Sequence, residues 1–164
     1  MKHRNSSPSE PNLGATAVTQ LTLAVFRLNG VLLHWGDQWV APLGLTSARW
    51  QMLGAIALAD TALTAPQIGE GMGVSRQGAQ KQINLLLEQG LIEARPNPAH
   101  QRSPHYALTR KGLALYHRAD AIWATKAVEL AALIPAAKVS AATQTLESMQ
   151  RELRTSNPST KDKS

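Results

Sequence analysis

The chain has 164 residues, of which 43% are hydrophobic and 17% are charged, a composition typical of a soluble globular protein of one domain in size. It contains no cysteine, which excludes disulfides, thiolate metal sites and cysteine-based redox sensing. The net charge is +6, and residues 46–112 carry the largest share of the surplus, a distribution that favours a nucleic-acid partner.

Residues 1–16 are rich in Ser, Pro and Asn, so we expect a flexible tail there. The basic start has no apolar run behind it, and a secretory signal is therefore not expected. No stretch approaches the ~18 apolar residues of a membrane span. These features predict a cytoplasmic protein without a membrane partner.

A first helix is predicted from about Val18 to Val40. Its apolar residues recur at alternating steps of three and four, which is the spacing of a helix whose apolar stripe packs against another helix. We interpret residues 17–45 as a dimerisation helix. The stripe comprises Val18, Leu21, Val25, Leu28, Leu32, Trp35 and Trp39.

Two further helices are predicted from their capping residues. Thr46 is a good N-cap for a helix that reaches about Ala59, with Trp50, Leu53, Ile56 and Ala57 facing inward. Thr64 and Gln67 then have the spacing of a capping box. They predict a short helix that ends where Gly73 supplies the required backbone conformation.

Ser75 caps the next predicted helix, which runs to Gln89 and stops at Gly90. One face is apolar, with Ala79, Ile83, Leu86 and Leu87 at helical spacing. The opposite arc holds side chains that donate hydrogen bonds to phosphates and base edges. No carboxylate lies between Val74 and Leu87, as a polyanionic partner requires. The arc comprises Arg76, Gln77, Gln80, Lys81 and Asn84.

Residues 91–95 and 105–108 are predicted to form paired strands around a loop rich in proline. A helix-turn-helix followed by such a β-ribbon is a winged helix. We therefore predict a mainly α fold in which residues 46–110 form a winged helix-turn-helix DNA-binding domain with a two-stranded β-wing. N- and C-terminal dimerisation helices would flank this domain.

The stretch from Leu45 to Gly112 holds a series of short motifs in a specific order and spacing. They are Leu45-Thr46, Trp50, Leu53, Leu63-Thr64, Ile68, Val74-Ser75, Leu87-Glu88-Gln89-Gly90-Leu91-Ile92, Asn97-Pro98, Arg102 and Leu108-Thr109-Arg110-Lys111-Gly112. With these motifs the stretch resembles the MarR-type (multiple antibiotic resistance regulator) family of bacterial winged-helix transcriptional regulators. It departs from the family pattern in the wing, where His100 stands in place of the usual acidic residue.

The predicted function is a DNA-binding regulator, most simply a repressor, that reads a pseudo-palindromic operator in double-stranded DNA. Two recognition helices in a homodimer would enter successive major grooves. Arg102 would enter the adjacent minor groove, where negative potential attracts a guanidinium. The predicted contacts are Ser75, Arg76, Gln77, Gln80, Lys81, Asn84 and Arg102.

Residues 111–154 are predicted to form two further dimerisation helices that Pro135 separates, with a flexible tail over 155–164. Together with the first helix they carry more apolar surface than one small core covers. A two-fold dimer, which the resemblance also implies, would bury it. The alternative is an intramolecular bundle. The apolar positions are Leu113, Tyr116, Trp123, Ala127, Leu130 and Ile134, then Val139, Ala142, Leu146, Met149 and Leu153.

The resemblance implies a crevice for a small aromatic or phenolic effector. Trp35, Trp39 and Trp50, beside His34 and Asp37, would give it an aromatic wall with polar handles. The alternative is that these tryptophans only pack in the core.

Other functions have weaker support in the residues. No phosphate-binding glycine loop or clustered acids indicate an enzyme, and no His spacing indicates a metal or another cofactor site. An RNA partner would favour more aromatic stacking residues. A winged-helix protein-interaction module without DNA binding is the main alternative.

Overall fold

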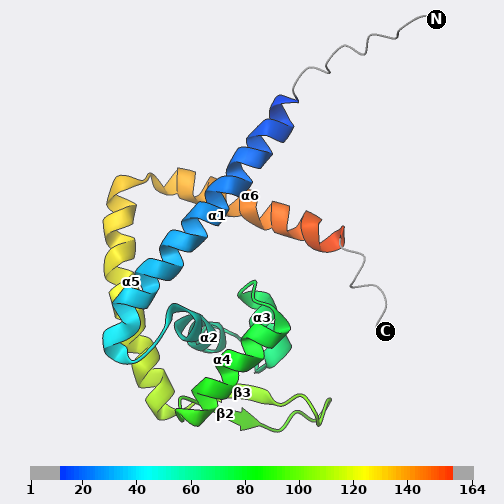
Figure 1. Ribbon diagram of the computed structural model, residues 1–164, viewed down its shortest axis with the longest axis vertical. Helices are drawn as coiled ribbons and strands as arrows, with labels where there is room; N and C mark the ends of the chain where they lie inside the picture. The colour runs from blue at the N-terminus through cyan, green and yellow to red at the C-terminus, as the bar shows by residue number, and fades with distance from the viewer. Residues whose placement is uncertain (1–11, 157–164) are drawn as a thin grey trace, which may run out of the picture. The chain divides into compact units, whose positions relative to one another are not determined.

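The computed structural model describes residues 12–156, which divide into two compact units between Ala119 and Asp120. The parts of the two expected tails that fall on residues 1–11 and 157–164 lie outside this range. The elements shown in Figure 1 are α1 (Leu13–Val40), the 3₁₀ turn η1 (Ala41–Leu43), α2 (Ser47–Ala57), β1 (Leu63–Thr64), α3 (Ala65–Gly71), α4 (Arg76–Glu88), β2 (Ile92–Arg95), β3 (His105–Leu108), α5 (Arg110–Leu133) and α6 (Ala136–Thr155).

Helix α1 begins at Leu13, five residues before the predicted start at Val18. The cause is local: the side-chain oxygen of Asn12 accepts a hydrogen bond from the backbone N–H of Ala15 at 3.1 Å. An asparagine in this position satisfies one of the donors that a helix start leaves unpaired. The expected tail is therefore wrong over residues 13–16.

The expectation that no stretch resembles a membrane span also needs correction. The segment Leu13–Leu43 is long enough to cross a membrane, and its mean hydropathy reaches 1.3 over an 18-residue window in which nothing is buried. Polar residues such as Gln20 and Arg27 interrupt the apolar run, which is why counting uninterrupted apolar residues missed it. Exposed apolar side chains, Phe26 among them, also lie outside the predicted stripe.

The helix-turn-helix forms as its capping residues predicted. The Gln67 side chain accepts a hydrogen bond from the Thr64 N–H at 2.8 Å at the start of α3. Gly73, in the turn, has φ +65°, a conformation that side chains other than glycine rarely adopt. The Ser75 hydroxyl then accepts from the Gly78 N–H at 3.1 Å and so caps α4.

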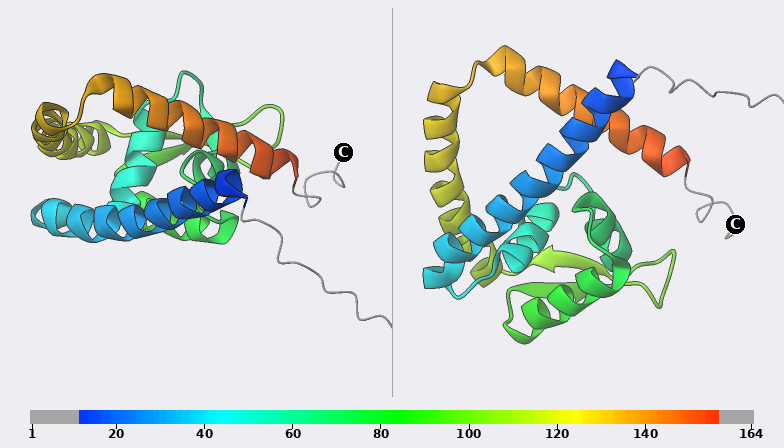
Figure 2. Two further views of the ribbon diagram at one scale, coloured as in Figure 1. Left: turned by 90° about the horizontal axis from the view of Figure 1, so that it is seen from above. Right: turned by 45° about the horizontal axis from the view of Figure 1, so that its top comes forward.

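The sheet has three antiparallel strands in the order β1-β3-β2, one more than predicted. Strands β2 and β3 pair in the register Ile92↔Leu108 to Arg95↔His105. The two-residue strand β1 joins the other edge of β3, with Leu63 opposite Tyr106. Such a short strand leaves no periodic pattern in the sequence. Figure 2 shows the loop between β2 and β3 extending beyond the strands as the wing.

The core of the first unit lies where α2, α3 and α4 meet the sheet. Met52, Leu53, Ile68, Ile83 and Leu86 are fully buried there. Leu53 was predicted to face inward, whereas Met52 was not. The start of α5 closes the same core through its buried Gly112, Tyr116 and Ala119. The core therefore holds α4 by one face and leaves the other face exposed.

The second unit comprises the rest of α5 and helix α6, which Pro135 separates as predicted. No residue of α6 is buried, and its predicted apolar residues include Leu153 at 69% exposure. A helix of this kind gains most of its stability from a packing partner. The dimerisation role of residues 111–154 stays a prediction.

Candidate nucleic-acid interface

Helix α4 presents a polar face to solvent because its apolar face is fixed in the core. Ala79, Ile83 and Leu86 have no exposed surface, and α4 packs on both α3 and α2. The predicted contact residues all lie on the exposed side, and none of the side chains from position 75 to 87 is acidic. They are Ser75, Arg76, Gln77, Gln80, Lys81 and Asn84.

Two of these side chains hold each other in place. The Gln80 amide nitrogen donates to the Asn84 side-chain oxygen at 2.9 Å, one helical turn away. An amide nitrogen carries two hydrogens and an amide oxygen accepts two hydrogen bonds, so each side chain keeps further bonding capacity. The pair is thus oriented before a ligand arrives. The sequence placed both residues on one arc but did not indicate this bond.

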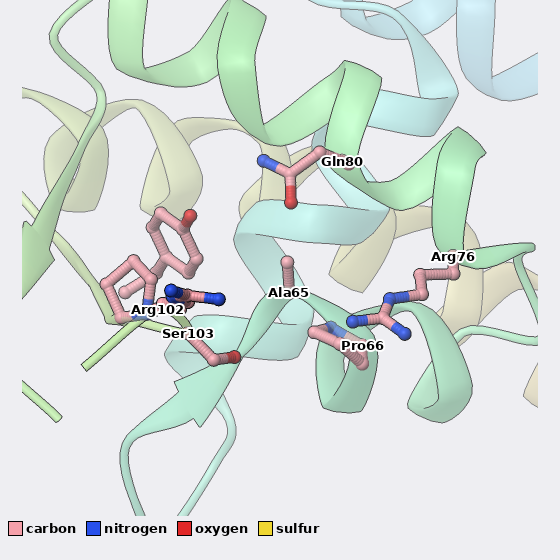
Figure 3. Close-up of a pocket in the computed structure, with 8 residues that line it drawn as sticks. Ala65, Pro66, Arg76, Gln80, Arg102 and Ser103 are labelled. Atoms are coloured by element: carbon pink, nitrogen blue, oxygen red, sulfur yellow. The ribbon is translucent and has the colours of Figure 1, made fainter. Parts of the chain in front are cut away.

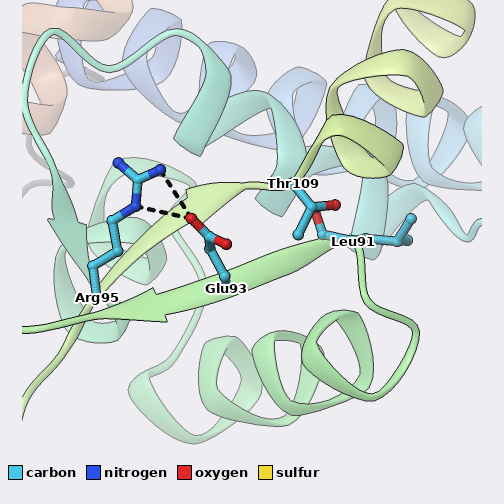
Figure 4. A network of polar contacts seen from close by, with 4 residues as sticks. All are labelled: Leu91, Glu93, Arg95 and Thr109. Carbon is cyan, nitrogen blue, oxygen red and sulfur yellow. Dashed lines mark hydrogen bonds and ion pairs between the residues drawn. The ribbon is translucent and has the colours of Figure 1, made fainter.

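The C-terminal end of α4 is tied to the sheet and to α5. Gly90 adopts φ +64°, and its carbonyl oxygen accepts from the Thr109 hydroxyl at 2.8 Å. The Lys111 ammonium donates to the carbonyl of Gln89 at 2.8 Å. Figure 4 shows Thr109 beside Leu91, whose carbonyl accepts from the Thr109 N–H at 3.1 Å. These bonds hold the exposed face of α4 at a fixed orientation to the wing.

Asn97 organises the wing loop. Its side chain is nearly buried, donates to the Ser103 carbonyl at 2.8 Å and accepts from the Ala99 N–H at 3.1 Å. Sequence reasoning identified Asn97 only through the family resemblance. Its role is to close the loop, which fixes the position of Arg102 between its two ends.

An ion pair does form in the wing, but it does not involve Arg102. The guanidinium of Arg95 contacts a carboxylate oxygen of Glu93 at 2.9 Å on strand β2 (Figure 4). Both side chains are more than half exposed, so the pair contributes little to stability. Within residues 12–156, no acidic side chain forms an ion pair with Arg102 or Arg76.

A pocket of about 70 Å³ lies between the wing, α3 and α4. Figure 3 shows the side chains of Arg76 and Arg102 pointing toward each other from its two sides, with Gln80 on α4 beside them. Arg102 and Arg76 therefore both line this pocket. No pattern in the sequence indicated that these two side chains would meet. The other lining residues are Ala65, Pro66, Ser103, Pro104 and Tyr106.

The predicted effector residues lie at the junction of α1 and α2. The rings of Trp35 and Trp39 are 4.5 Å apart between centroids, and the Trp50 ring lies close to Gly36. The Asp37 carboxylate is occupied, because it accepts from the Ser47 N–H at 2.6 Å and so ties α1 to α2. His34 shares a hydrogen bond with Gln38 at 3.0 Å.

Comparison with known proteins points to one family. Residues 43–103 match the sequence model of the MarR family. An uncharacterized protein of Mycobacterium tuberculosis strain H37Rv is 43% identical over 95 residues, which are 58% of this chain and 65% of that protein. The chain thus matches a little less than two thirds of this relative's length.

Solved structures share the fold. The transcriptional repressor CouR, solved with a 23-mer DNA duplex, is 25% identical, with 87% of this chain and 99% of that chain covered at a TM-score of 0.68. CouR of Rhodococcus jostii RHA1, solved with p-coumaroyl-CoA, is 21% identical over 79% of this chain and 90% of that chain, at a TM-score of 0.69. Residues 43–103 are thus similar to the MarR family, and the fold is similar to that of winged-helix transcription regulators of this family.

Proposed function

We propose that this chain is a homodimeric, sequence-specific DNA-binding regulator that acts as a repressor. The observation that carries the proposal is the exposed face of α4, which offers cationic and amide donors and no carboxylate. Donors of this kind bind phosphates and base edges in a major groove. The structure of CouR with a DNA duplex supports the same use of the shared fold.

Each side chain has a proposed role that follows from its chemistry. Ser75 and Lys81 would bind phosphates, since a hydroxyl that accepts a bond still has its own hydrogen to donate. Gln77 and the Gln80–Asn84 pair would read base edges, where an amide makes paired bonds with adenine. In this scheme the pre-oriented pair contributes to specificity more than to affinity.

A dimer follows from the exposed apolar helices. Leu28 of α1 and Leu153 of α6 are more than half exposed, and a solvent-exposed apolar surface costs about 25 cal/mol per Å² relative to a buried one. A second copy related by a two-fold axis would cover these faces. The same dimer would set two α4 helices about 34–36 Å apart, so that they could enter successive major grooves.

A small aromatic or phenolic effector would release the DNA. The support is the close Trp35–Trp39 pair beside Trp50 and His34, together with the p-coumaroyl-CoA bound by CouR, whose fold is similar. Aromatic walls with few polar groups are typical of sites for flat ligands. Asp37 is less suited to this role because its carboxylate already binds α2.

The test is binding to duplex DNA that the protein itself selects from a random library. We expect log Kd to rise steeply and linearly with log salt concentration, because phosphate contacts release counterions. Lys81→Ala should weaken binding to all sequences similarly and lower the salt slope by about one per protomer. Lys138→Ala, on α6, is the matched control and should leave the slope unchanged.

The same experiment separates the alternative function. A winged-helix module that binds only proteins would select no duplex and would shift no generic DNA at low salt. Either result would contradict the proposal, since non-specific phosphate contacts alone give measurable affinity under those conditions.

A further inference from the structure

The pocket between α4 and the wing has an unusual charge arrangement. Arg76 and Arg102 point into one hollow from two elements far apart in the sequence (Figure 3). None of the eight lining residues is acidic, and neither arginine has an acidic partner in the described part of the chain. Two guanidinium groups that share a hollow repel each other unless an anion lies between them.

The lining also offers neutral donors. Ser103 has a hydroxyl, and Gln80 keeps one amide hydrogen beyond the one it gives to Asn84. Tyr106, at 6% exposure, belongs to the wall, whereas Arg76, Gln80 and Arg102 are exposed and lie at the mouth. The pocket is thus positively charged, rich in donors and open to a ligand from solvent.

Its size selects among ligands. A volume of about 70 Å³ is several times the ~10–15 Å³ that one ordered water needs. It is well below the ~300 Å³ at which pockets for organic ligands begin. A tetrahedral oxyanion suits these limits, and arginine forms paired hydrogen bonds with such a group.

We propose that this pocket binds one phosphodiester group of the DNA backbone, with Arg76 and Arg102 clamping it from the two sides. The inference rests on the proposed DNA-binding function and deepens it. Arg102 then acts on the backbone rather than in the minor groove. A single phosphate would fix the wing against the recognition helix and so set the register of α4 on the duplex.

A double-mutant cycle tests the clamp on the selected duplex. Because Arg76 and Arg102 would hold the same phosphate, each change to Ala should weaken binding at least about tenfold, and the double variant should lose little more than either single one. Arg102→Lys should restore only part of the affinity, since lysine keeps the charge but not the paired bonds. Arg118→Ala, on α5, controls for the loss of one positive charge.

Flanking sequence distinguishes the clamp from minor-groove binding. If the pocket binds a phosphate, Arg102→Ala should weaken duplexes with A·T-rich and G·C-rich flanks by the same factor. A loss confined to A·T-rich flanks would overturn the inference in favour of the minor groove. Additive losses in the double-mutant cycle would also overturn it, while leaving the proposed function intact.

Neutralising single phosphates identifies the ligand itself. One methylphosphonate position per half-site should weaken the wild-type protein about as much as Arg102→Ala does, and should have no further effect on that variant. Without such a position the inference fails. A second measurement tests whether inorganic phosphate raises the Tm of the wild-type protein at millimolar concentration. If it does, and no methylphosphonate position changes the DNA affinity, the pocket binds a free anion and the inference is overturned. If wild type selects no duplex, the proposed function fails first.

Discussion

At the scale of single residues, Gly112 is the glycine at which an added Cβ would meet its nearest neighbour at the shortest distance. A Cβ on this residue would overlap the backbone carbonyl oxygen of Leu91, the same atom that accepts from the Thr109 N–H. Because the neighbour is backbone rather than a flexible side chain, α5 or the start of β2 would have to shift. The close approach is therefore a steric requirement for glycine, independent of any positive φ.

We predict that Gly112→Ala lowers the free energy of unfolding by about 1–3 kcal/mol, the usual cost of overpacking. In a chain of this size that corresponds to a fall in Tm of several degrees. Thermal unfolding followed by circular dichroism measures it. Gly71→Ala is the control, since a Cβ there meets nothing within 4 Å. Equal Tm values for the two variants would contradict this account.

The glycine conformations at the helix ends could be predicted from the sequence, whereas the meeting of two arginines in the pocket could not. Gly73 and Gly90 were predicted as helix ends, and both have positive φ, because this backbone conformation depends on the residue type itself. The meeting of Arg76 and Arg102 was not predicted. It depends on how the wing loop closes around Asn97, which is a tertiary contact with no local pattern.

At the scale of elements, capping signals located the helices more accurately than periodicity did. Thr46 and Ser75 cap α2 and α4 as predicted. Pro135, which was predicted to break the long helix, stands directly before α6. The stripe assigned to α2 was less accurate: Met52 is buried, whereas Trp50 is only partly so. A helix enclosed on several sides buries more than one stripe, and a single stripe of period 3.6 does not describe it.

The junction of α1 and α2 carries the prediction for an effector. A flat aromatic acid that binds beside Trp35 and Trp39 should quench tryptophan fluorescence and weaken DNA binding over the same concentration range. Trp35→Phe should lose most of the quenching. Trp123→Phe, on α5, should retain it. If no aromatic acid in a panel changes either signal, the tryptophans serve packing alone.

At the scale of the whole molecule, the described chain has one well-packed core and two helices, α1 and α6, whose apolar side chains are exposed. The core of the first unit explains why α4 presents its polar face, yet α1 exposes apolar side chains along its length and α6 buries none. Sequence periodicity predicted these stripes because heptad spacing is local. Periodicity could not predict what covers these stripes. The sequence pattern of an apolar stripe is the same whether a second copy, another helix or a lipid packs against it.

A dimer makes stability depend on protein concentration. If two copies cover α1, the Tm should rise as the protein is concentrated, by mass action. Leu28→Lys should then place a charge in the interface, which favours the monomer and lowers the Tm at high concentration. Sedimentation velocity measures the change in mass directly. Leu58→Lys is the matched control, since Leu58 lies just after α2 and is 77% exposed.

The competing explanation for α1 is a lipid surface, because the helix is long and apolar enough to span a membrane. Flotation with phospholipid vesicles separates the two. A covered interface predicts that the dimeric protein stays with the aqueous fraction, since the apolar stripe is no longer available to lipid. Monomeric wild-type protein that floats with vesicles and keeps a constant Tm would refute the dimer. It would also remove the two-fold geometry by which a pair of α4 helices would read a pseudo-palindrome.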